Sequence, residues 1–285
     1  MSIDNPPAAV LWIVATPIGN LEDMSPRAAR VLHEVAVIAA EDTRHSSRLT
    51  RHLGIDTPML SLHEHNEGAR AEQLLARLGQ GESVALISDA GTPLISDPGF
   101  VLVRAAREAG FRVETVPGAC AAIAALSVAG LPSDRFVFEG FLPAKTTARQ
   151  TRLAELAEES RTLVFYESSH RIEKSVADMV AVLGADRRIA LCRELTKMHE
   201  QSVSLPASDL LEWLAADDNH RRGEFVLVVA GAPVGAPGGL EVGLDALLTE
   251  LLAITGTKPA AQIAARLTGV TRNEAYARAL ALGAA

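Results

Sequence analysis

The sequence predicts an α/β protein made of two α/β domains followed by a small C-terminal helical tail. Apolar runs rich in β-branched residues alternate with segments of helical periodicity over residues 10–230, a pattern typical of sheets covered by helices. A stretch dense in Pro and Gly at 231–243 indicates a linker, and the residues after it show apolar positions three and four apart. We therefore expect domains at 1–117 and 118–232, and a linker with a helical tail at 233–285.

The first domain is predicted to contain a largely parallel sheet, because its strands alternate with amphipathic helical stretches. Strands are expected at 10–17, 35–40, 58–62, 83–89 and 112–117. The second domain opens with an apolar helix at 119–129 and is expected to hold a mixed sheet. Its strands are predicted at 135–142, 162–166, 187–192, 201–205 and 224–230.

Three helices are expected in the tail, at 244–254, 258–267 and 271–281, with Gly256 and Gly269 between them. The last two resemble a helix-turn-helix. Because the formal charge of the tail is zero, the sequence leaves open whether this segment packs and assembles or contacts RNA.

Composition narrows the class of protein. The 285 residues are 48% hydrophobic and 22% charged, enough for two sizeable cores, and no apolar run approaches the roughly 18 to 20 residues of a membrane span. Residues 1–7 lack the features of a signal peptide, so we expect a cytoplasmic protein. The two cysteines, Cys120 and Cys192, are too few for a disulfide framework or a zinc cluster. A net charge of -8 argues against nonspecific coating of nucleic acid, although not against a local basic groove.

The loop at 88–99 is the most informative segment. Gly91 and Gly99 permit positive φ or close backbone approach, Pro93 and Pro98 stiffen the chain, and Asp97 is predicted to cap a helix at 99–109. The segment has neither the GxGxxG spacing of a dinucleotide loop nor the ending of a P-loop. We therefore expect it to contact a small polar molecule that lacks a pyrophosphate, unless it is an ordinary connecting loop.

Two further loops follow predicted strands and are expected at the same edge of the sheet, where open α/β folds bind ligands. One, at 16–23, contains Pro17, Gly19 and Asn20. The other, at 117–122, is rich in small residues that would let a helix N-terminus approach a carboxylate. Each loop alone is equally well explained by packing, whereas three at successive strand ends favour a ligand site.

Charged side chains gather in three other places. Residues 41–52 contain three arginines and two histidines, which would either bind phosphates or form a solvated helix face. The segments at 166–171 and 193–200 offer Lys197, Glu200, Glu167 and His170 for proton chemistry, with interdomain salt bridges as the alternative. His63 and His65 have no clear third metal ligand, so we favour a hydrogen-bonded loop and expect no metal. A serine-hydrolase elbow is missing from the sequence.

The ordered set of these motifs closely resembles the small-subunit (16S) ribosomal RNA cytidine 2′-O-methyltransferases, a branch of the tetrapyrrole methylase superfamily. The matching segments are 16–20 (Thr-Pro-Ile-Gly-Asn), 41–44 (Glu-Asp-Thr-Arg), 88–99, 117–121 (Pro-Gly-Ala-Cys-Ala), 140–145 (Gly-Phe-Leu-Pro-Ala-Lys), 166–171, 193–200 and 223–225 (Gly-Glu-Phe). The resemblance covers nearly the whole chain. Ser169 departs from the pattern, which has proline there, and we expect a looser turn but no lost reacting group.

The resemblance implies a homodimer that binds S-adenosylmethionine in a cleft between its two α/β domains and methylates the ribose of a cytidine in the small ribosomal subunit. No membrane or metal is expected to take part. The cofactor-binding candidates are Pro17, Gly19, Ser88, Asp89, Ala90, Gly91, Leu94, Ile95, Ser96, Pro117, Gly118, Ala119, Tyr166 and Cys192. The catalytic candidates are Lys197 and Glu200, with Glu167 behind them, to orient and deprotonate the hydroxyl. The candidates for RNA binding are Arg44, Arg48, Lys145, Arg149 and Arg171.

Two rival functions remain open at this stage. A tetrapyrrole C-methyltransferase would share the cofactor loops, but it would need an open apolar cleft and would not require the basic stretch or the tail. A noncatalytic RNA-binding assembly factor could keep a cofactor pocket without turnover.

Overall fold

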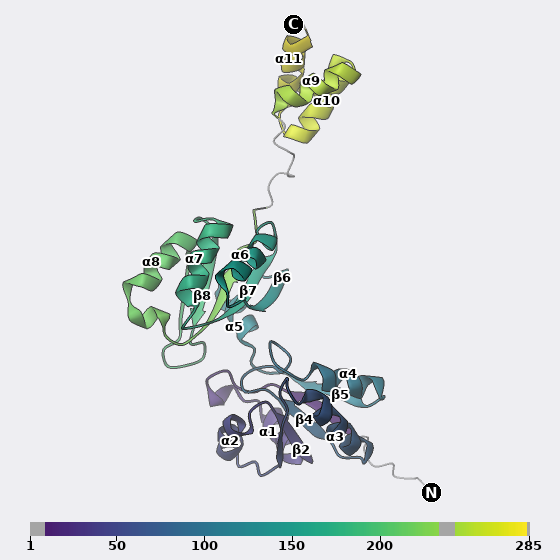
Figure 1. Ribbon diagram of the computed structural model, residues 1–285, viewed down its shortest axis with the longest axis vertical. Helices are drawn as coiled ribbons and strands as arrows, with labels where there is room; N and C mark the ends of the chain where they lie inside the picture. Colours follow the sequence, from purple (N-terminus) through teal and green to yellow (C-terminus); the bar gives the residue numbers. More distant parts are fainter. Residues whose placement is uncertain (1–8, 234–242, 284–285) are drawn as a thin grey trace. The chain divides into compact units, whose positions relative to one another are not determined.

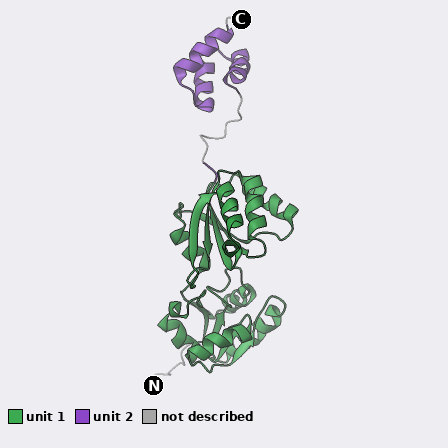
Figure 2. Cartoon of the chain, turned by 90° about the vertical axis from the view of Figure 1, so that its left-hand side faces the viewer, with its two compact units in different colours: residues 1–231 green, residues 232–285 purple. Residues whose placement is uncertain are grey.

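The computed structural model describes residues 9–233 and 243–283 (Figure 1). The chain divides into two compact units, residues 1–231 and 232–285 (Figure 2). Residues 1–7 and most of the predicted linker, 234–242, lie outside the described residues. None of the described helices combines the length and the apolar character that crossing a membrane requires.

The first sheet, predicted to be largely parallel, is parallel in all of its strand pairs. Its strands are β1 (Val10–Val14), β2 (Val37–Ala40), β3 (Met59–Ser61), β4 (Val84–Ile87) and β5 (Arg112–Val116). They lie in the order β3-β2-β4-β1-β5, so β4 and β1 are central. Every strand therefore ends at the same edge, and the loops that follow the strands meet there.

Helices cover both faces of this sheet. They are α1 (Pro26–Glu34), α2 (Thr43–His52), α3 (Glu67–Gly79) and α4 (Phe100–Glu108), with a short 3-10 turn, η1, at Leu21–Asp23. Alternate residues of β4 point to opposite faces: Val84 and Leu86 pack in one hydrophobic cluster with α3 and α4, whereas Ala85 and Ile87 pack in another with α1. Burial on both faces explains why β2 and β4 are continuously apolar.

The second sheet is mixed, again as predicted. Its strands are β6 (Phe136–Phe141), β7 (Thr162–Ser168), β8 (Arg188–Arg193), β9 (Gln201–Pro206) and β10 (Glu224–Val229). The order is β6-β7-β10-β8-β9; only the β6–β7 pair is parallel. Helices α6 (Thr146–Glu155), α7 (Ile172–Leu183) and α8 (Ala207–Ala216) cover one face, and α5 (Ala121–Val128) packs on the other. A 3-10 turn, η2, spans Asp218–Arg221.

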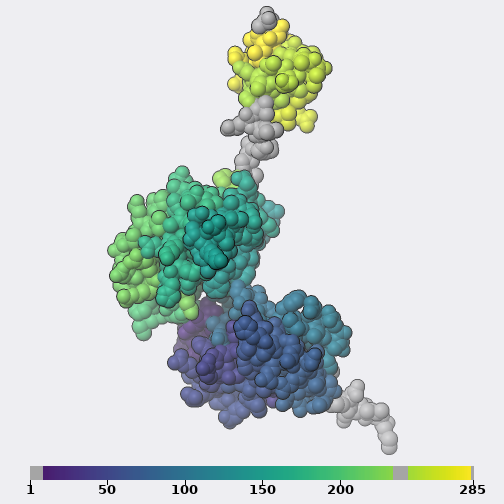
Figure 3. Space-filling view, in the orientation of Figure 1, coloured from purple at the N-terminus to yellow at the C-terminus, as the bar shows by residue number. Residues whose placement is uncertain are grey.

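The residues of the two sheets form adjoining masses within the first compact unit, purple to blue for the first and teal to green for the second (Figure 3). The strands of the first sheet end at Val116, and α5 packs against the second sheet. The predicted boundary between residues 117 and 118 stays a prediction, because the two sheets belong to one compact unit.

The second unit is helical, as predicted from its periodicity. It contains α9 (Leu244–Ile254), α10 (Thr257–Thr268) and α11 (Arg272–Gly283). Leu248, Ala260, Ala264 and Ala275 form its own buried core. Gly269 ends α10 with φ of 75°, a left-handed conformation that glycine adopts without strain.

The start of α4 differs from the prediction. Asp97 does not cap the helix; the cap residue is Gly99, with φ of 127°, and α4 begins at Phe100. Instead, Glu67 at the start of α3 accepts hydrogen bonds from the backbone amides of Gly99 (3.0 Å) and Val101 (2.8 Å). The cap comes from a residue 32 positions away in the chain, which local sequence patterns do not show.

Candidate active site

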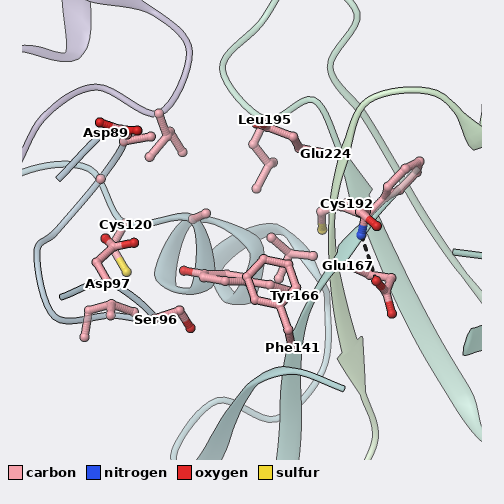
Figure 4. A pocket seen from close by; sticks show the side chains of 18 of the residues that line it. Asp89, Ser96, Asp97, Cys120, Phe141, Tyr166, Glu167, Cys192, Leu195 and Glu224 are labelled. Atoms are coloured by element: carbon pink, nitrogen blue, oxygen red, sulfur yellow. Dashed lines mark hydrogen bonds between the residues drawn. The ribbon is translucent and has the colours of Figure 1, made fainter. Parts of the chain in front are cut away.

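A cavity of about 490 Å³ is lined by loops at the ends of strands from both sheets (Figure 4). Its size is that of a site for a small molecule or cofactor. The lining residues are Ile18, Glu41, Asp89, Ala90, Gly91, Thr92, Ile95, Ser96, Asp97, Cys120, Ala121, Phe141, Tyr166, Glu167, Ser168, Ser169, Cys192, Leu195, Lys197, Gly223, Glu224, Phe225 and Val226. The segments predicted at 16–23, 88–99, 117–122, 166–171 and 193–200 all contribute to it.

Backbone hydrogen bonds hold the loops of the first sheet together. Thr16 and Gly91 exchange two such bonds, of 2.9 and 3.1 Å, which join the loop after β1 to the loop after β4. The Thr92 hydroxyl donates to the carbonyl of Ala119 at 2.9 Å and so ties in the loop after β5. The three segments that the sequence singles out therefore form one wall.

Two of the lining loops carry backbone strain. Leu94 and Ser96 have φ of 72° and 70°, and Glu194 and Thr196 have φ of 51° and 66°. These are the four non-glycine residues with positive φ that the described part of the chain contains. Such conformations cost on the order of 1 to 3 kcal/mol each and persist where the surroundings enforce them, often at functional sites.

Three carboxyl groups lie at one side of the cavity, and Figure 4 shows Asp89 and Asp97 across from the strands of the second sheet. Burial raises the pKa of Glu41 above its usual value, and the charges of Asp97 and Asp89 raise it further. Burial also raises the pKa of Asp97, against the opposite effect of a hydrogen bond from Ser88. This side of the cavity favours protons or other positive charge.

Aromatic rings form another side. Tyr166 packs edge to face with Phe138 and Phe141, at centroid distances of 5.0 and 5.7 Å, and its ring lies beside that of Phe141 in Figure 4. The Tyr166 hydroxyl accepts a hydrogen bond from the Ala122 amide at 3.2 Å, which fixes the start of α5. Burial raises the pKa of Tyr166 far above its usual value, so the phenol stays protonated at any physiological pH.

Lys197 reaches the cavity from the loop after β8. Its Nζ donates to Glu194 Oε1 at 2.9 Å and to Glu224 Oε2 at 2.8 Å. Burial alone would lower the pKa of Lys197, but these two hydrogen bonds outweigh it and raise the pKa above the usual value. A Cβ added at Gly19 would lie 2.5 Å from Lys197 Cγ, so the glycine makes room for the lysine stem.

The cofactor-binding candidates fall into two groups. Asp89, Ala90, Gly91, Ile95, Ser96, Tyr166 and Cys192 line the cavity. Pro17, Gly19, Ser88, Leu94, Pro117, Gly118 and Ala119 do not line it but belong to the same loops. Some of the second group have a structural reason to be there: a Cβ on Gly118 would lie 2.9 Å from that of Ala15, and the Ser88 hydroxyl donates to Gly91 O at 3.4 Å. The cofactor role of both groups stays a prediction.

The three catalytic candidates are placed differently from one another. Lys197 lines the cavity. Glu167 is buried in β7, where it accepts hydrogen bonds from the Ser175 hydroxyl (2.5 Å) and the Ser168 amide (2.8 Å). Glu200 is not among the lining residues; its carboxylate accepts from the Thr196 amide at 2.6 Å and so shapes the Lys197 loop.

The prediction that Arg149 contacts RNA is wrong. Its side chain is 2% exposed and its Nε donates to Asp178 Oδ2 at 2.6 Å, with further bonds to the carbonyls of Pro143 and Ala144. An exposed, unpaired arginine and a buried, paired one look identical in sequence.

Arg171 is also engaged within the fold. Its guanidinium lies 3.4 Å from the Glu167 carboxylate and donates to the carbonyls of Leu142 and Pro143. Arg44, Arg48 and Lys145 are exposed. Arg44 pairs with Asp42 at the start of α2, and its side chain is 91% exposed.

Several lining residues were not assigned from the sequence. Glu41, Asp97 and Glu224 lie inside motifs that the sequence analysis quotes, but only the fold turns them toward one cavity. Glu41 had a usable signal, since it directly follows β2 at the edge where ligands bind. The sequence offered no such signal for Phe141, because aromatic residues at the ends of strands usually pack in a hydrophobic core.

The His63 segment forms a hydrogen-bonded loop, in agreement with the favoured interpretation. The Asn66 side chain accepts from the His63 amide at 2.9 Å and donates to the carbonyl of Ser61 at 3.2 Å. Among the described residues no group of three His, Cys, Asp or Glu side chains is arranged to hold a metal ion.

Comparison with known proteins identifies the family. The family model described as Tetrapyrrole (Corrin/Porphyrin) Methylases matches residues 10–211. The protein named Ribosomal RNA small subunit methyltransferase I of Pseudomonas aeruginosa is 58% identical over 276 residues, covering 96% of this chain and 97% of that protein. The chain belongs to this methyltransferase family. Proteins of the same name from Escherichia coli O157:H7 and Synechocystis are 52% and 46% identical over 95% and 96% of this chain, which covers 94% and 99% of their lengths.

The tail and the fold agree with membership of the methyltransferase family. Residues 239–283 match a model described as the RsmI C-terminal HTH domain, and the predicted helix-turn-helix lies in this segment. Uroporphyrin-III-C-methyltransferase from Thermus thermophilus superposes with a TM-score of 0.53 at 21% identity, over 78% of this chain and 94% of that one. A diphthine synthase superposes with a TM-score of 0.58 at 14% identity, over 78% and 90%. At these identities the two structures show the shared fold alone.

Proposed function

We propose that this protein transfers a methyl group from S-adenosylmethionine to the ribose 2′-hydroxyl of a cytidine in 16S ribosomal RNA of the small subunit. One observation carries the proposal: a relative named ribosomal RNA small subunit methyltransferase I matches this chain at 58% identity across nearly its whole length. The cytidine and the ribose oxygen come from the resemblance of the motifs described above.

The charge of the cavity suits this cofactor. Four of the lining residues, Glu41, Asp89, Asp97 and Glu224, have carboxyl side chains that are at least partly exposed, and Lys197 is the one cationic side chain among the described lining residues. A fifth acidic residue, Glu167, also lines the cavity, but its side chain is 1% exposed and lies beside Arg171. Anionic phosphates would be repelled, and a ligand with a sulfonium and an ammonium group would be attracted. S-adenosylmethionine, which has both, supplies a methyl group that is activated for attack by an oxygen nucleophile.

The residues that would hold the cofactor fall into two sets. Tyr166, Phe141 and Leu195 offer apolar surface for an adenine ring, and backbone groups of the loop at 88–99 offer hydrogen bonds for the amino-acid part. Catalysis would depend chiefly on positioning, with the ribose oxygen held roughly 3 to 3.5 Å from the methyl carbon.

Lys197 is suited to orient the acceptor hydroxyl. Because two carboxylates keep it an ammonium, it can donate a hydrogen bond and stabilise negative charge on oxygen, but it does not accept the proton. Glu200 supports the Lys197 loop through the Thr196 amide, and Glu167 supports the end of β7. In this proposal Glu200 and Glu167 position other residues of the site and do not contact the reacting atoms.

The RNA path is proposed to cross α2. Arg44, Arg48 and Arg51 are exposed and lie on one side of this helix, and no acidic residue occurs within it. Lys145 is exposed at the start of α6. Replacing Arg48, Arg51 and Lys145 together by Gln should weaken RNA binding and flatten its salt dependence, by about one unit of slope per lost phosphate contact. An unchanged slope would exclude this path.

A transfer assay with labelled S-adenosylmethionine tests the reaction. Assembled small subunits, naked ribosomal RNA and a tetrapyrrole are the three acceptors. Label that appears in the subunit and is lost when the target ribose lacks its 2′-hydroxyl supports the proposal. Label in the tetrapyrrole would indicate the C-methyltransferase, and cofactor binding without transfer would indicate an assembly factor.

Cys120 provides an independent test of the cofactor site. It lines the cavity and is partly exposed, whereas Cys192 is buried and burial raises its pKa to about 11, which leaves that thiol unreactive. S-adenosylmethionine should slow alkylation of Cys120, measured by mass spectrometry. Equal labelling with and without the cofactor would place it elsewhere.

The predicted homodimer also belongs to this proposal. Seven of the eight residues of helix α5 are apolar, yet Ile123 and Val128 are 53% and 48% exposed in the single chain. A second copy of the chain would cover such a face. Light scattering should give twice the chain mass and Ile123→Glu should reduce it, whereas a wild-type monomer would contradict the dimer. A cytoplasmic location follows from the proposed substrate.

A further inference from the structure

Glu41 belongs both to the cavity proposed to bind the cofactor and to the segment that leads into α2. It directly follows β2 at the carboxyl edge of the parallel sheet, and its side chain lines the cavity. Two residues later α2 begins, and the exposed arginines proposed to bind the RNA backbone follow in the same helix. An RNA strand held on α2 would therefore present a ribose to Glu41.

The other acid–base groups of the cavity are unsuited to accept a proton. Lys197 and Tyr166 are held in their protonated forms, and so is the buried thiol of Cys192. Glu224 is tied to Lys197, and Glu167 already accepts hydrogen bonds from Ser175 and Ser168. Glu200 does not line the cavity.

The remaining carboxyl groups are Asp89, Asp97 and Glu41. Asp89 Oδ1 accepts the Asp42 amide at 3.0 Å and so shapes the loops. Asp97 belongs to the loop that precedes α4, whereas Glu41 belongs to the segment that leads into α2, where the RNA is proposed to bind. Burial raises the pKa of Glu41, and the charges of Asp97, Asp89 and Glu64 add to this, against a hydrogen bond from the Asp89 backbone. A carboxylate becomes a stronger base as its pKa rises toward the working pH.

We propose that Glu41 is the proton acceptor for the ribose hydroxyl, a role that rests on the proposed function. As the ribose oxygen forms its bond to the methyl carbon, the carbon–sulfur bond breaks and its electron pair stays on sulfur, which becomes a neutral thioether. The hydroxyl proton passes to a carboxylate oxygen of Glu41. Lys197, as an ammonium, holds the same oxygen from the second sheet and does not compete for the proton.

The test compares Glu41→Gln with Glu64→Gln. Glu64 is exposed and does not line the cavity, but its charge is among those that raise the pKa of Glu41, so it is a matched electrostatic control. In Glu41→Gln the single-turnover methylation rate should fall by about 100-fold or more, the usual effect of a general base. The rate should also lose its decline at acid pH. Glu64→Gln should reach the wild-type methylation rate at neutral pH. Its rate should decline at a slightly lower pH than that of the wild type, because the pKa of Glu41 is no longer raised by the Glu64 charge.

Measurements of binding affinity and of thermal stability distinguish the loss of a proton acceptor from damage to the fold. The affinity for the RNA should be within the wild-type range in Glu41→Gln. The affinity for S-adenosylmethionine should fall only slightly, because Asp89, Asp97 and Glu224 still line the cavity. Because the folded-state pKa of Glu41 is raised, ionised Glu41 destabilises the folded protein at neutral pH, and Glu41→Gln should unfold at a higher temperature there. This gain should vanish at low pH, where Glu41 is protonated.

A Glu41→Gln enzyme with the wild-type rate and pH profile would overturn the inference and leave the proposed function intact. Failure of the wild-type protein to methylate the subunit would instead overturn the proposed function. Glu41→Asp should recover part of the methylation rate, and its rate should again decline at acid pH. A rate that is as independent of pH as that of Glu41→Gln would contradict a role in proton transfer.

Discussion

At the scale of single residues, the charged partners of a side chain determine what it can do. Lys197 faces the cavity as an ammonium because Glu194 and Glu224 accept its hydrogen bonds. Arg149 has the same charge but is buried beside Asp178 and has a structural role. The sequence analysis proposed Lys197 for catalysis and Arg149 for RNA binding.

Replacing Lys197 by Met keeps the stem and removes the charge. The methylation rate should fall by about 100-fold, because negative charge on the acceptor oxygen loses its stabilisation, while the affinity for S-adenosylmethionine should change little. Single-turnover kinetics and calorimetric binding measure the two effects. Lys174→Met, at an exposed lysine of α7 outside the cavity lining, is the control and should keep the wild-type rate; an unaffected rate in Lys197→Met would exclude this role.

Replacing Arg149 by Met should lower the free energy of unfolding by about 3 to 5 kcal/mol, because the buried carboxylate of Asp178 loses its partner. Urea denaturation measures this effect. Arg48→Met, at an exposed position of α2, should change the stability little. The double variant Arg149→Met/Asp178→Leu should recover part of the loss, and no recovery would argue against an uncompensated charge as the cause.

At the scale of elements, the loop at 88–99 depends on a contact with α3. Glu67 caps α4 by accepting the amides of Gly99 and Val101. A carboxylate at a helix N-terminus is further stabilised by the helix dipole. The cap positions the loop end that precedes α4, next to the cavity-lining Ser96 and Asp97.

Glu67→Ala should therefore lower the free energy of unfolding by about 1 to 2 kcal/mol, the usual effect of a lost N-cap. The affinity for S-adenosylmethionine should fall as well, since the loop at 88–99 is less well held. Denaturation and calorimetry measure these effects. Glu72→Ala, at an exposed position of the same helix, should change neither quantity; equal effects of the two variants would contradict the cap.

At the scale of the whole molecule, the helical unit at 232–285 has its own core, and every residue of the cavity lies in the first unit. A chain that ends at residue 233 should therefore fold and bind S-adenosylmethionine with wild-type affinity. Circular dichroism and calorimetry measure this, and lost cofactor binding would contradict independence of the two units. Its affinity for RNA then decides whether the tail contacts the substrate.

The prediction of the fold succeeded for local reasons. Each strand of both sheets was found within a few residues of its predicted range. Burial on both faces leaves a continuous apolar run in central strands such as β4, whereas exposed strands such as β9 alternate exposed and partly buried residues. The ends of helices were less predictable. The cap of α4 depends on Glu67, which lies 32 residues before Gly99 and is brought there by packing of α3 against α4.

The sequence by itself determined the family, the two kinds of sheet and the loops that build the site, because periodicity, turn residues and motif order are properties of neighbouring residues. The tertiary structure decided which side chains meet in the cavity and in which charge state. It placed Glu41 near Asp97 and Asp89, and Lys197 between Glu194 and Glu224. Burial and the distances between charges set these pKa values, and both quantities exist only once residues far apart in the chain are packed together.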